Sequence, residues 1–179
     1  MKHRALALAV CALPFLAVDL AAAAGPVQLK GVVSGVMDGD TLRVSFDEGE
    51  AIPSQYATCS KVYKTMAWIK QTTIMCPDPK AKAFCSAEAK SYATRVARGK
   101  AVTVEVTGCA AQGGLKGTVT LNEGPLAGKN LGLEMVRGGM ARTTKEGLNS
   151  RLKDEFQGAQ RDAMLARRGL WGAKPCKMP

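Results

Sequence analysis

Histidine is almost absent from this sequence of 179 residues, and its single occurrence is His3, close to the N-terminus. A Ser-His-Asp or Cys-His mechanism needs an imidazole as general base, and the HExxH zinc motif needs two. The N-terminal pattern predicts that residues 1–24 are removed as a signal peptide, which leaves no imidazole. Any hydrolytic chemistry would then depend on carboxylates, cationic side chains and a bound metal ion.

A hydrophobic run long enough to cross a membrane is also missing from the N-terminal region. The first residues instead follow the order of a signal peptide: a basic start at 1–4, an apolar run at 5–18 and small residues at 21–24. The apolar run is shorter than the roughly 20 residues that a membrane helix needs. We therefore expect cleavage after Ala24, export to the periplasm or the medium, and no stable membrane anchor.

Acidic residues are few, with 15 Asp and Glu against 25 Lys and Arg and a pI near 9.5. Cleavage after Ala24 removes Lys2, Arg4 and Asp19, which changes the formal net charge from +10 to +9. Residues 25–179 are long enough to form a single domain with its own core. A basic domain suits DNA or RNA as a partner, although such a charge can also serve solubility alone. We expect a monomer without a small-molecule cofactor.

The cysteines occur without any CxxC pair, and together with the missing histidine this argues against a zinc site. Export favours disulfides instead, because they persist in oxidising compartments. The connectivity is open from the sequence, but the short loop between Cys76 and Cys85 favours that pair. After signal-peptide cleavage, five of the six cysteines remain: Cys59, Cys76, Cys85, Cys109 and Cys176.

A short acidic turn, Asp38-Gly39-Asp40, stands between two runs in which apolar and polar residues alternate. Asp-Gly favours a tight turn because glycine tolerates positive φ, so the local residues predict a hairpin with two solvated aspartates. Two carboxylates on one turn are also a hard, oxygen-rich site suited to a divalent cation. Both interpretations stay open on these residues alone.

Periodicity predicts the remaining elements. Alternating runs indicate strands at 27–36, 41–47, 61–74, 101–107 and 115–121, and apolar residues at helical spacing indicate helices near 86–98, 133–140 and 148–170. The connection at 51–67 contains Cys59. We expect it to form either a flap tethered by a disulfide or an extended hairpin.

Several motifs resemble, in the same order, those of the staphylococcal nuclease-like (thermonuclease) family. The resemblance covers about residues 27–172 and is carried by Val36-Met37-Asp38-Gly39-Asp40-Thr41-Leu42, Cys76-Pro77-Asp78, Leu133-Glu134-Met135-Val136-Arg137-Gly138-Gly139-Met140-Ala141 and Arg168-Gly169-Leu170-Trp171. It implies an α+β fold, namely a small five-stranded β-barrel of the oligonucleotide-binding (OB) type with about three packed α-helices. Members of the family cleave nucleic-acid phosphodiesters with two arginines, a glutamate and a calcium ion held by aspartates.

Carried over position by position, the resemblance implies a modified site. Asp40 matches the first metal-ligand aspartate, Asp38 is its neighbour on the turn, and Met75 stands at the second ligand position. Lysines stand at both arginine positions and an aspartate at the glutamate position. The implied catalytic residues are therefore Lys70, Asp78 and Lys116, with Asp38 and Asp40 as ligands of Ca²⁺.

Each departure weakens the expected chemistry. Lysine lacks the planar fork with which arginine grips two phosphate oxygens, and aspartate is about one methylene shorter than glutamate. Methionine is a soft thioether and a poor calcium ligand. Three hypotheses follow: an exported metal-dependent nuclease, a catalytically weak or inactive relative that binds nucleic acid, and a cell-envelope interaction module.

Overall fold

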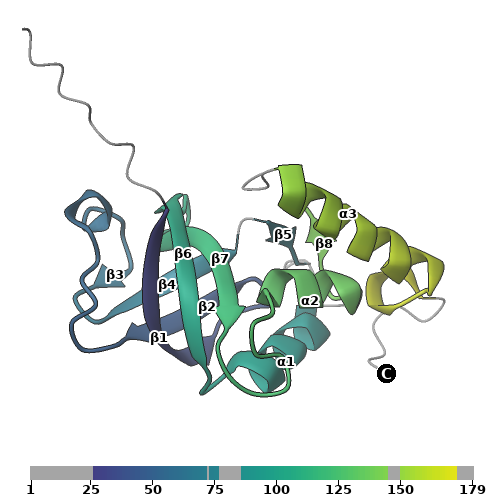
Figure 1. The fold of residues 1–179 in the computed structure, drawn as a ribbon, viewed down its shortest axis with the longest axis horizontal. Helices are drawn as coiled ribbons and strands as arrows, with labels where there is room; N and C mark the ends of the chain where they lie inside the picture. Colours follow the sequence, from purple (N-terminus) through teal and green to yellow (C-terminus); the bar gives the residue numbers. More distant parts are fainter. Residues whose placement is uncertain (1–25, 72, 77–85, 145–149, 173–179) are drawn as a thin grey trace, which may run out of the picture.

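Five strands close into a β-barrel at the centre of the molecule (Figure 1). The computed structural model describes residues 26–71, 73–76, 86–144 and 150–172. Around the barrel the order is β1–β2–β4–β7–β6 and back to β1. The pairs are antiparallel except β4–β7, which is parallel. The strands are β1 (Val27–Val36), β2 (Thr41–Phe46), β4 (Met66–Gln71), β6 (Ala101–Cys109) and β7 (Leu115–Leu121). The predicted α+β barrel is therefore confirmed.

The barrel closes because one face of each strand is apolar. On β2 and β6 the side chains alternate between buried and half-buried along most of the strand, which is the period of two that a one-sided strand requires. The inward set fills the barrel interior and includes Leu42, Val44, Phe46, Val102, Val104, Val106, Leu115, Val119 and Leu121. These are the alternating positions from which the strands were predicted.

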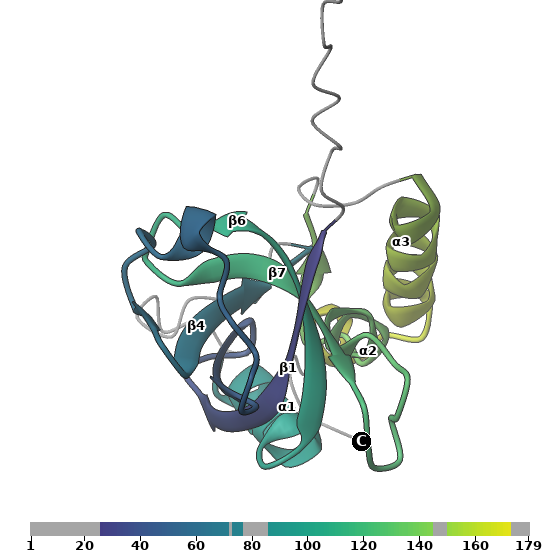
Figure 2. The same ribbon diagram turned by 60° about the vertical axis from the view of Figure 1, so that its left-hand side comes forward.

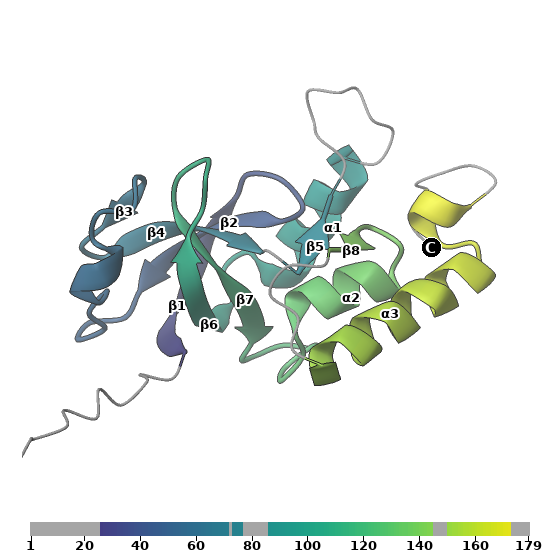
Figure 3. The same ribbon diagram turned by 90° about the horizontal axis from the view of Figure 1, so that it is seen from above.

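The described residues form three α-helices beside the barrel, of which α1 and α2 contact its strands: α1 (Ser86–Ala97), α2 (Leu131–Arg137) and α3 (Ser150–Leu165). Helix α2 lies between the barrel and α3 (Figures 1 and 3). The Asn130 side chain caps α2 by accepting a hydrogen bond from the Leu133 amide at 3.1 Å. A small sheet of β5 (Ile74–Met75) and β8 (Arg142–Thr143) joins the end of the barrel to the helices. No described helix is long and apolar enough to span a bilayer.

Two predicted boundaries were wrong. The run at 61–74 is divided into β3 (Val62–Tyr63), β4 and β5, because the chain turns at 64–65 so that Tyr63 can pair with Met66. The third helix ends at Leu165 instead of reaching Leu170, since Arg167 has a positive φ of 50° and a 3₁₀ turn follows at Gly169–Trp171.

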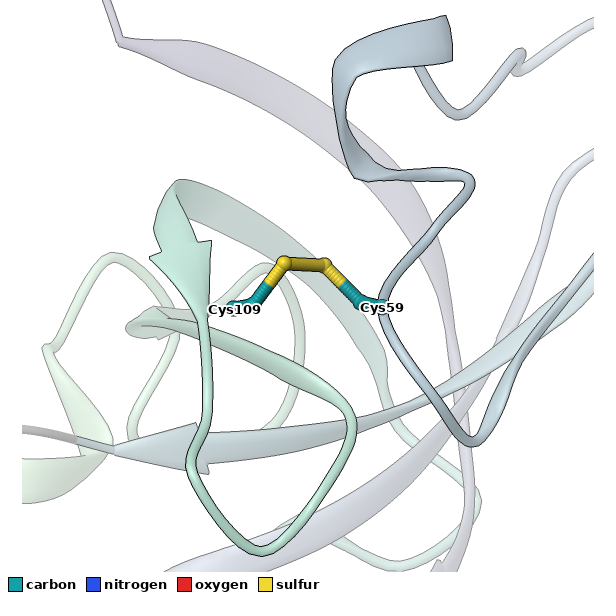
Figure 4. Close-up of a disulfide and its surroundings, with 2 residues drawn as sticks. All are labelled: Cys59 and Cys109. Atoms are coloured by element: carbon teal, nitrogen blue, oxygen red, sulfur yellow. A yellow bond between two sulfur atoms is a disulfide. The ribbon is translucent and has the colours of Figure 1, made fainter.

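The disulfide joins Cys59 to Cys109, with 5.5 Å between their Cα atoms (Figure 4). Cys59 follows the short 3₁₀ helix η1 (Ser54–Tyr56), whereas Cys109 is the last residue of β6. Figure 2 shows η1 close to this end of β6. Of the two alternatives for 51–67, the disulfide-tethered flap is therefore present, and β3 forms a short hairpin with the start of β4.

The predicted Cys76–Cys85 pair is wrong, because Cys76 is a free thiol. Its sulfur lies against the acidic turn, where a Cβ on Gly39 would come within 2.6 Å of it. Short sequence separation favoured Cys85 as its partner, but the fold directs this thiol toward the barrel. Cys85 and Cys176 lie outside the described residues.

Candidate phosphate-binding site

The acidic turn between β1 and β2 is held by its own hydrogen bonds. The Asp40 amide donates to Asp38 Oδ1 at 3.1 Å, and the Met37 amide donates to the Thr41 carbonyl at 2.9 Å. Gly39 is buried, and a Cβ there would lie 2.7 Å from the Cβ of Ala89 on α1. The turn therefore packs against the rest of the protein with a glycine where no larger residue fits.

Asp40 is a buried carboxylate whose two oxygens both accept hydrogen bonds, with only 3% of the residue exposed. Its Oδ1 accepts hydrogen bonds from Lys70 Nζ at 2.5 Å and from Thr41 Oγ1 at 3.1 Å. Its Oδ2 accepts one from the Cys76 amide at 3.2 Å. The interpretation of both aspartates as solvated turn residues is thus wrong for Asp40, because the barrel end closes over it.

Lys70 and Lys116 come together through the register of β4 and β7. In this parallel pair Lys70 stands opposite Lys116. Both are half-buried and alternate with fully buried neighbours, so they share the face that points away from the barrel interior. Thr41, directly after Asp40, is paired with Lys70 in the β2–β4 ladder, which brings the acidic turn to the same place.

The structure therefore brings four of the five predicted site residues to one end of β4: Asp38, Asp40, Lys70 and Lys116. The fifth, Asp78, lies outside the described residues. Met75, at the predicted second ligand position, lies on β5 and pairs with Arg142 of β8 through the backbone. The main contact that sequence reasoning missed is the ion pair between Lys70 and Asp40.

Burial raises the pKa of two acidic groups at this site, the Asp38 carboxyl and the Cys76 thiol. Burial, the hydrogen bond with Asp40 and the charge of Asp40 all raise the pKa of Asp38, partly offset by the Thr41 hydroxyl and by Lys70. Burial, together with the charges of Asp40 and Asp38, raises the pKa of the Cys76 thiol far above its usual range. Cys76 is therefore protonated at neutral pH, and a protonated thiol is neither a nucleophile nor a metal ligand.

A cleft of about 380 Å³ opens beside Lys70 and Asp38. It lies between the flap, the loop that joins β6 to β7, and the acidic turn. Sequence reasoning assigned no role to most of this lining, because residues from three distant segments form it. The lining residues are Met37, Asp38, Thr41, Lys61, Tyr63, Trp68, Lys70, Gln112 and Gly113.

Comparison with known families adds to this geometry. The family model described as staphylococcal nuclease homologue matches residues 63–173, more than half of the chain. The chain belongs to the staphylococcal nuclease family. A search of curated proteins gave no match. The matched region begins at Tyr63, yet the structure shows that the staphylococcal nuclease barrel of this chain also includes β1 and β2, which carry the acidic turn between them.

Members of the staphylococcal nuclease family are known to use Ca²⁺. The metal-ligating side chains among the described residues of this homologue do not fit that ion. Calcium takes six to eight oxygen ligands at about 2.3–2.6 Å. The described residues contain no group of three or more His, Cys, Asp or Glu side chains able to hold a metal. One Asp40 oxygen already accepts from an ammonium and a hydroxyl, and the other accepts from an amide. The positive charge beside Asp40 is therefore supplied by Lys70.

Proposed function

We propose that this staphylococcal nuclease homologue is an exported protein that binds the phosphodiester backbone of DNA or RNA at the face formed by Lys70 and Lys116. The observation that supports this most directly is the parallel register that places the two lysines opposite one another. The two lysines lie on neighbouring strands of a protein whose formal net charge without residues 1–24 is +9, and Lys116 adds a positive charge near the Lys70–Asp40 ion pair, which suits phosphate oxygens. Such contacts follow the backbone and carry little sequence preference.

Export is supported by the N-terminal pattern and by the fold. The disulfide between Cys59 and Cys109 joins two segments that are 50 residues apart in sequence. Disulfides of this kind persist in the periplasm or outside the cell, whereas the cytosol keeps thiols reduced. We therefore propose that the protein resides in one of those oxidising compartments.

Hydrolysis of the bound phosphodiester is a second candidate, favoured by the buried Asp40 beside the two lysines. Fixed cations stabilise the charge that develops on the phosphate in the transition state, and a carboxylate can orient or deprotonate the attacking water. Asp78 is the family-derived candidate for that carboxylate. Since the described donors do not fit calcium, we derive no step of hydrolysis through a metal ion.

One experiment separates binding from cleavage. The purified protein without residues 1–24 is incubated with end-labelled DNA and RNA in calcium, in magnesium or in EDTA, and retention and cleavage are followed together. We expect retention in all three conditions, because lysines supply the positive charge. Negligible retention even at low salt would overturn the proposal and favour an envelope interaction module. Cleavage that is lost in Asp40→Asn would establish the second candidate.

A further inference from the structure

The ammonium of Lys70 stands where a metal ion on Asp40 would bind. Its Nζ is 2.5 Å from Asp40 Oδ1, within the range of about 2.3–2.6 Å at which calcium binds oxygen. A calcium ion on the same oxygen would therefore lie within roughly 5 Å of the ammonium. Two positive charges this close repel one another strongly at a buried carboxylate, because the surroundings screen them less than water does.

Hydrogen bonds also engage the carboxylate oxygens of the acidic turn. Besides Lys70, Asp40 Oδ1 accepts from the Thr41 hydroxyl, and Asp40 Oδ2 accepts from the Cys76 amide. Asp38 Oδ1 accepts from the Asp40 amide. A calcium ion needs about six to eight oxygen ligands, and these oxygens already serve other donors. The fold thus satisfies the turn with N–H and O–H groups.

The backbone holds Lys70 beside Asp40. The Gln71 amide donates to the Asp40 carbonyl at 2.8 Å, and Lys70 pairs with Thr41 in the β2–β4 ladder. On its other side β4 pairs with β7, where Lys116 stands opposite Lys70. Because strand pairings on both sides fix the Lys70 backbone next to the acidic turn, the ion pair with Asp40 is built into the barrel.

The same ammonium can also contact a phosphate. An ammonium has three N–H donors, and Lys70 uses one of them for Asp40. Its side chain is 34% exposed and lines the cleft of about 380 Å³, so the remaining donors can reach a ligand oxygen there. Charge-assisted hydrogen bonds of this kind are stronger than neutral ones. Lys70 thus offers a phosphate a positive charge that cannot dissociate from the protein.

We infer that Lys70 takes the place of the calcium ion in this homologue: its ammonium keeps the ion away from Asp40 and contacts the phosphate itself. The exclusion of calcium rests on the geometry of the acidic turn, whereas the phosphate contact rests on the proposed function. Lys70 is therefore the residue that determines whether the site takes a divalent cation. Replacing it, together with Met75 at the second ligand position, should convert the site to a calcium site.

Titration with calcium, followed by isothermal calorimetry, tests the exclusion in the wild type, in Lys70→Gln, in Met75→Asp and in the two changes combined. Met75→Asp supplies a hard oxygen ligand, and Lys70→Gln removes the ammonium but keeps a polar side chain. We expect saturable binding only in the combined variant, with a dissociation constant of about 10⁻⁴–10⁻³ M or tighter. Met75→Asp alone should not bind calcium, because Lys70 still occupies Asp40.

A matched control removes a lysine elsewhere. Lys90 is exposed on α1, so Lys90→Gln with Met75→Asp has the same net charge as the combined variant and should not bind calcium. Thermal unfolding verifies that each variant is folded. If Met75→Asp does not fold, Met75→Asn takes its place, because it adds an oxygen ligand without a charge.

Oligonucleotide binding tests the phosphate contact. Calcium and magnesium have the same charge and screen phosphates alike, so comparing them at equal concentration isolates a specific effect of calcium. The wild type should bind oligo(dT) equally in the two ions. The combined variant should bind it more tightly in calcium than in magnesium.

The possible outcomes separate this inference from the proposed function. Saturable calcium binding by the wild type would overturn the inference, and so would equal calcium binding by Met75→Asp with and without Lys70. A folded combined variant that binds no calcium would show that Lys70 is not what excludes the ion. Failure of the wild type to bind oligo(dT) in EDTA would overturn the proposed function and the phosphate contact, but not the exclusion of calcium.

Discussion

Among single residues, Asp40 most strongly determines what the candidate site can bind. Its carboxylate is buried and accepts hydrogen bonds from a lysine, a hydroxyl and an amide. The ammonium of Lys70 is the cationic partner of this buried carboxylate. The sequence placed Asp40 on the turn and Lys70 on the neighbouring strand, but the ion pair between them depends on the β2–β4 register.

Replacing Asp40→Asn should have opposite effects on stability and on binding. The amide supplies one oxygen where the carboxylate supplied two, so an NH₂ group must face either the Cys76 amide or Lys70. We expect the free energy of unfolding to fall by about 1–3 kcal/mol, as measured by urea denaturation. Oligonucleotide affinity should rise, because a negative charge is removed from beside the phosphate.

The control for this variant is Asp154→Asn, which removes the same charge at an exposed position on α3. It should leave stability within about 0.5 kcal/mol of the wild type. If the two variants have the same stability, the hydrogen bonds that we describe around Asp40 do not contribute as the structure indicates.

The raised pKa of Asp38 predicts that the free energy of unfolding depends on pH. Its pKa is raised in the folded protein, mainly by burial, so the fold binds this proton more tightly than the unfolded chain does. As pH rises from the ordinary aspartate value of 3.8 through the raised value, this residue therefore lowers the free energy of unfolding. Asp38→Asn keeps an oxygen that can accept from the Asp40 amide but removes the ionisation.

We expect the thermal midpoint of Asp38→Asn to exceed that of the wild type near neutral pH and to approach it in acid. Thermal unfolding at a series of pH values, from about pH 3 to about pH 7, measures the difference. An advantage that is largest in acid, or a loss of stability at neutral pH, would show that Asp38 is stabilised in its charged form instead.

Among the elements, regular alternation made the strands of the barrel predictable. On β6 and β7, inward valines and leucines recur at every second residue, so the period of two is visible without the fold. The order of motifs implied the five-stranded barrel and the three helices. The break at 64–65 was not visible, because the residues from 61 to 69 alternate across it and only the pairing of Tyr63 with Met66 reveals the turn.

Contacts between distant elements were the least predictable part. Cys59 and Cys109 pair because the flap folds over the end of β6, and nothing in their local sequence shows this contact. Family resemblance implied Lys70 and Lys116 as site residues, and the β4–β7 register shows them opposite one another. The cleft at Tyr63 and Trp68 needed the whole arrangement, since its lining comes from separate segments.

The flap tether should contribute strongly to stability. A disulfide whose ends are 50 residues apart restricts the unfolded chain, and Cys59→Ser with Cys109→Ser should lower the free energy of unfolding by about 2–4 kcal/mol. Denaturation with and without reductant measures this effect. Reductant should destabilise the wild type by about this amount more than it destabilises the double variant. Free thiols at both positions in protein purified without reductant would contradict the pairing.

On the scale of the whole molecule, the helices and the proposed nucleic-acid face lie at different parts of the barrel. The flap with β3 lies at the end of the barrel farthest from α3 (Figures 1 and 3). Lys70 and Lys116 lie where β4 and β7 meet, so the proposed binding face belongs to the barrel, while α2 and α3 complete the core. We propose that the net positive charge, +9 without residues 1–24, attracts phosphates generally and that Lys70 and Lys116 determine where they bind.

The salt dependence of oligonucleotide binding tests this account most directly. For single strands, each phosphate contact contributes about 0.7 to the slope of log K against log salt. Lys70→Gln with Lys116→Gln should therefore weaken binding and reduce the slope by roughly 1.4, measured by fluorescence anisotropy. The control, Lys90→Gln with Lys153→Gln, removes the same charge from exposed helix positions and should leave the slope nearly unchanged. Equal losses in the two double variants, or none in either, would contradict a phosphate-binding site at Lys70 and Lys116.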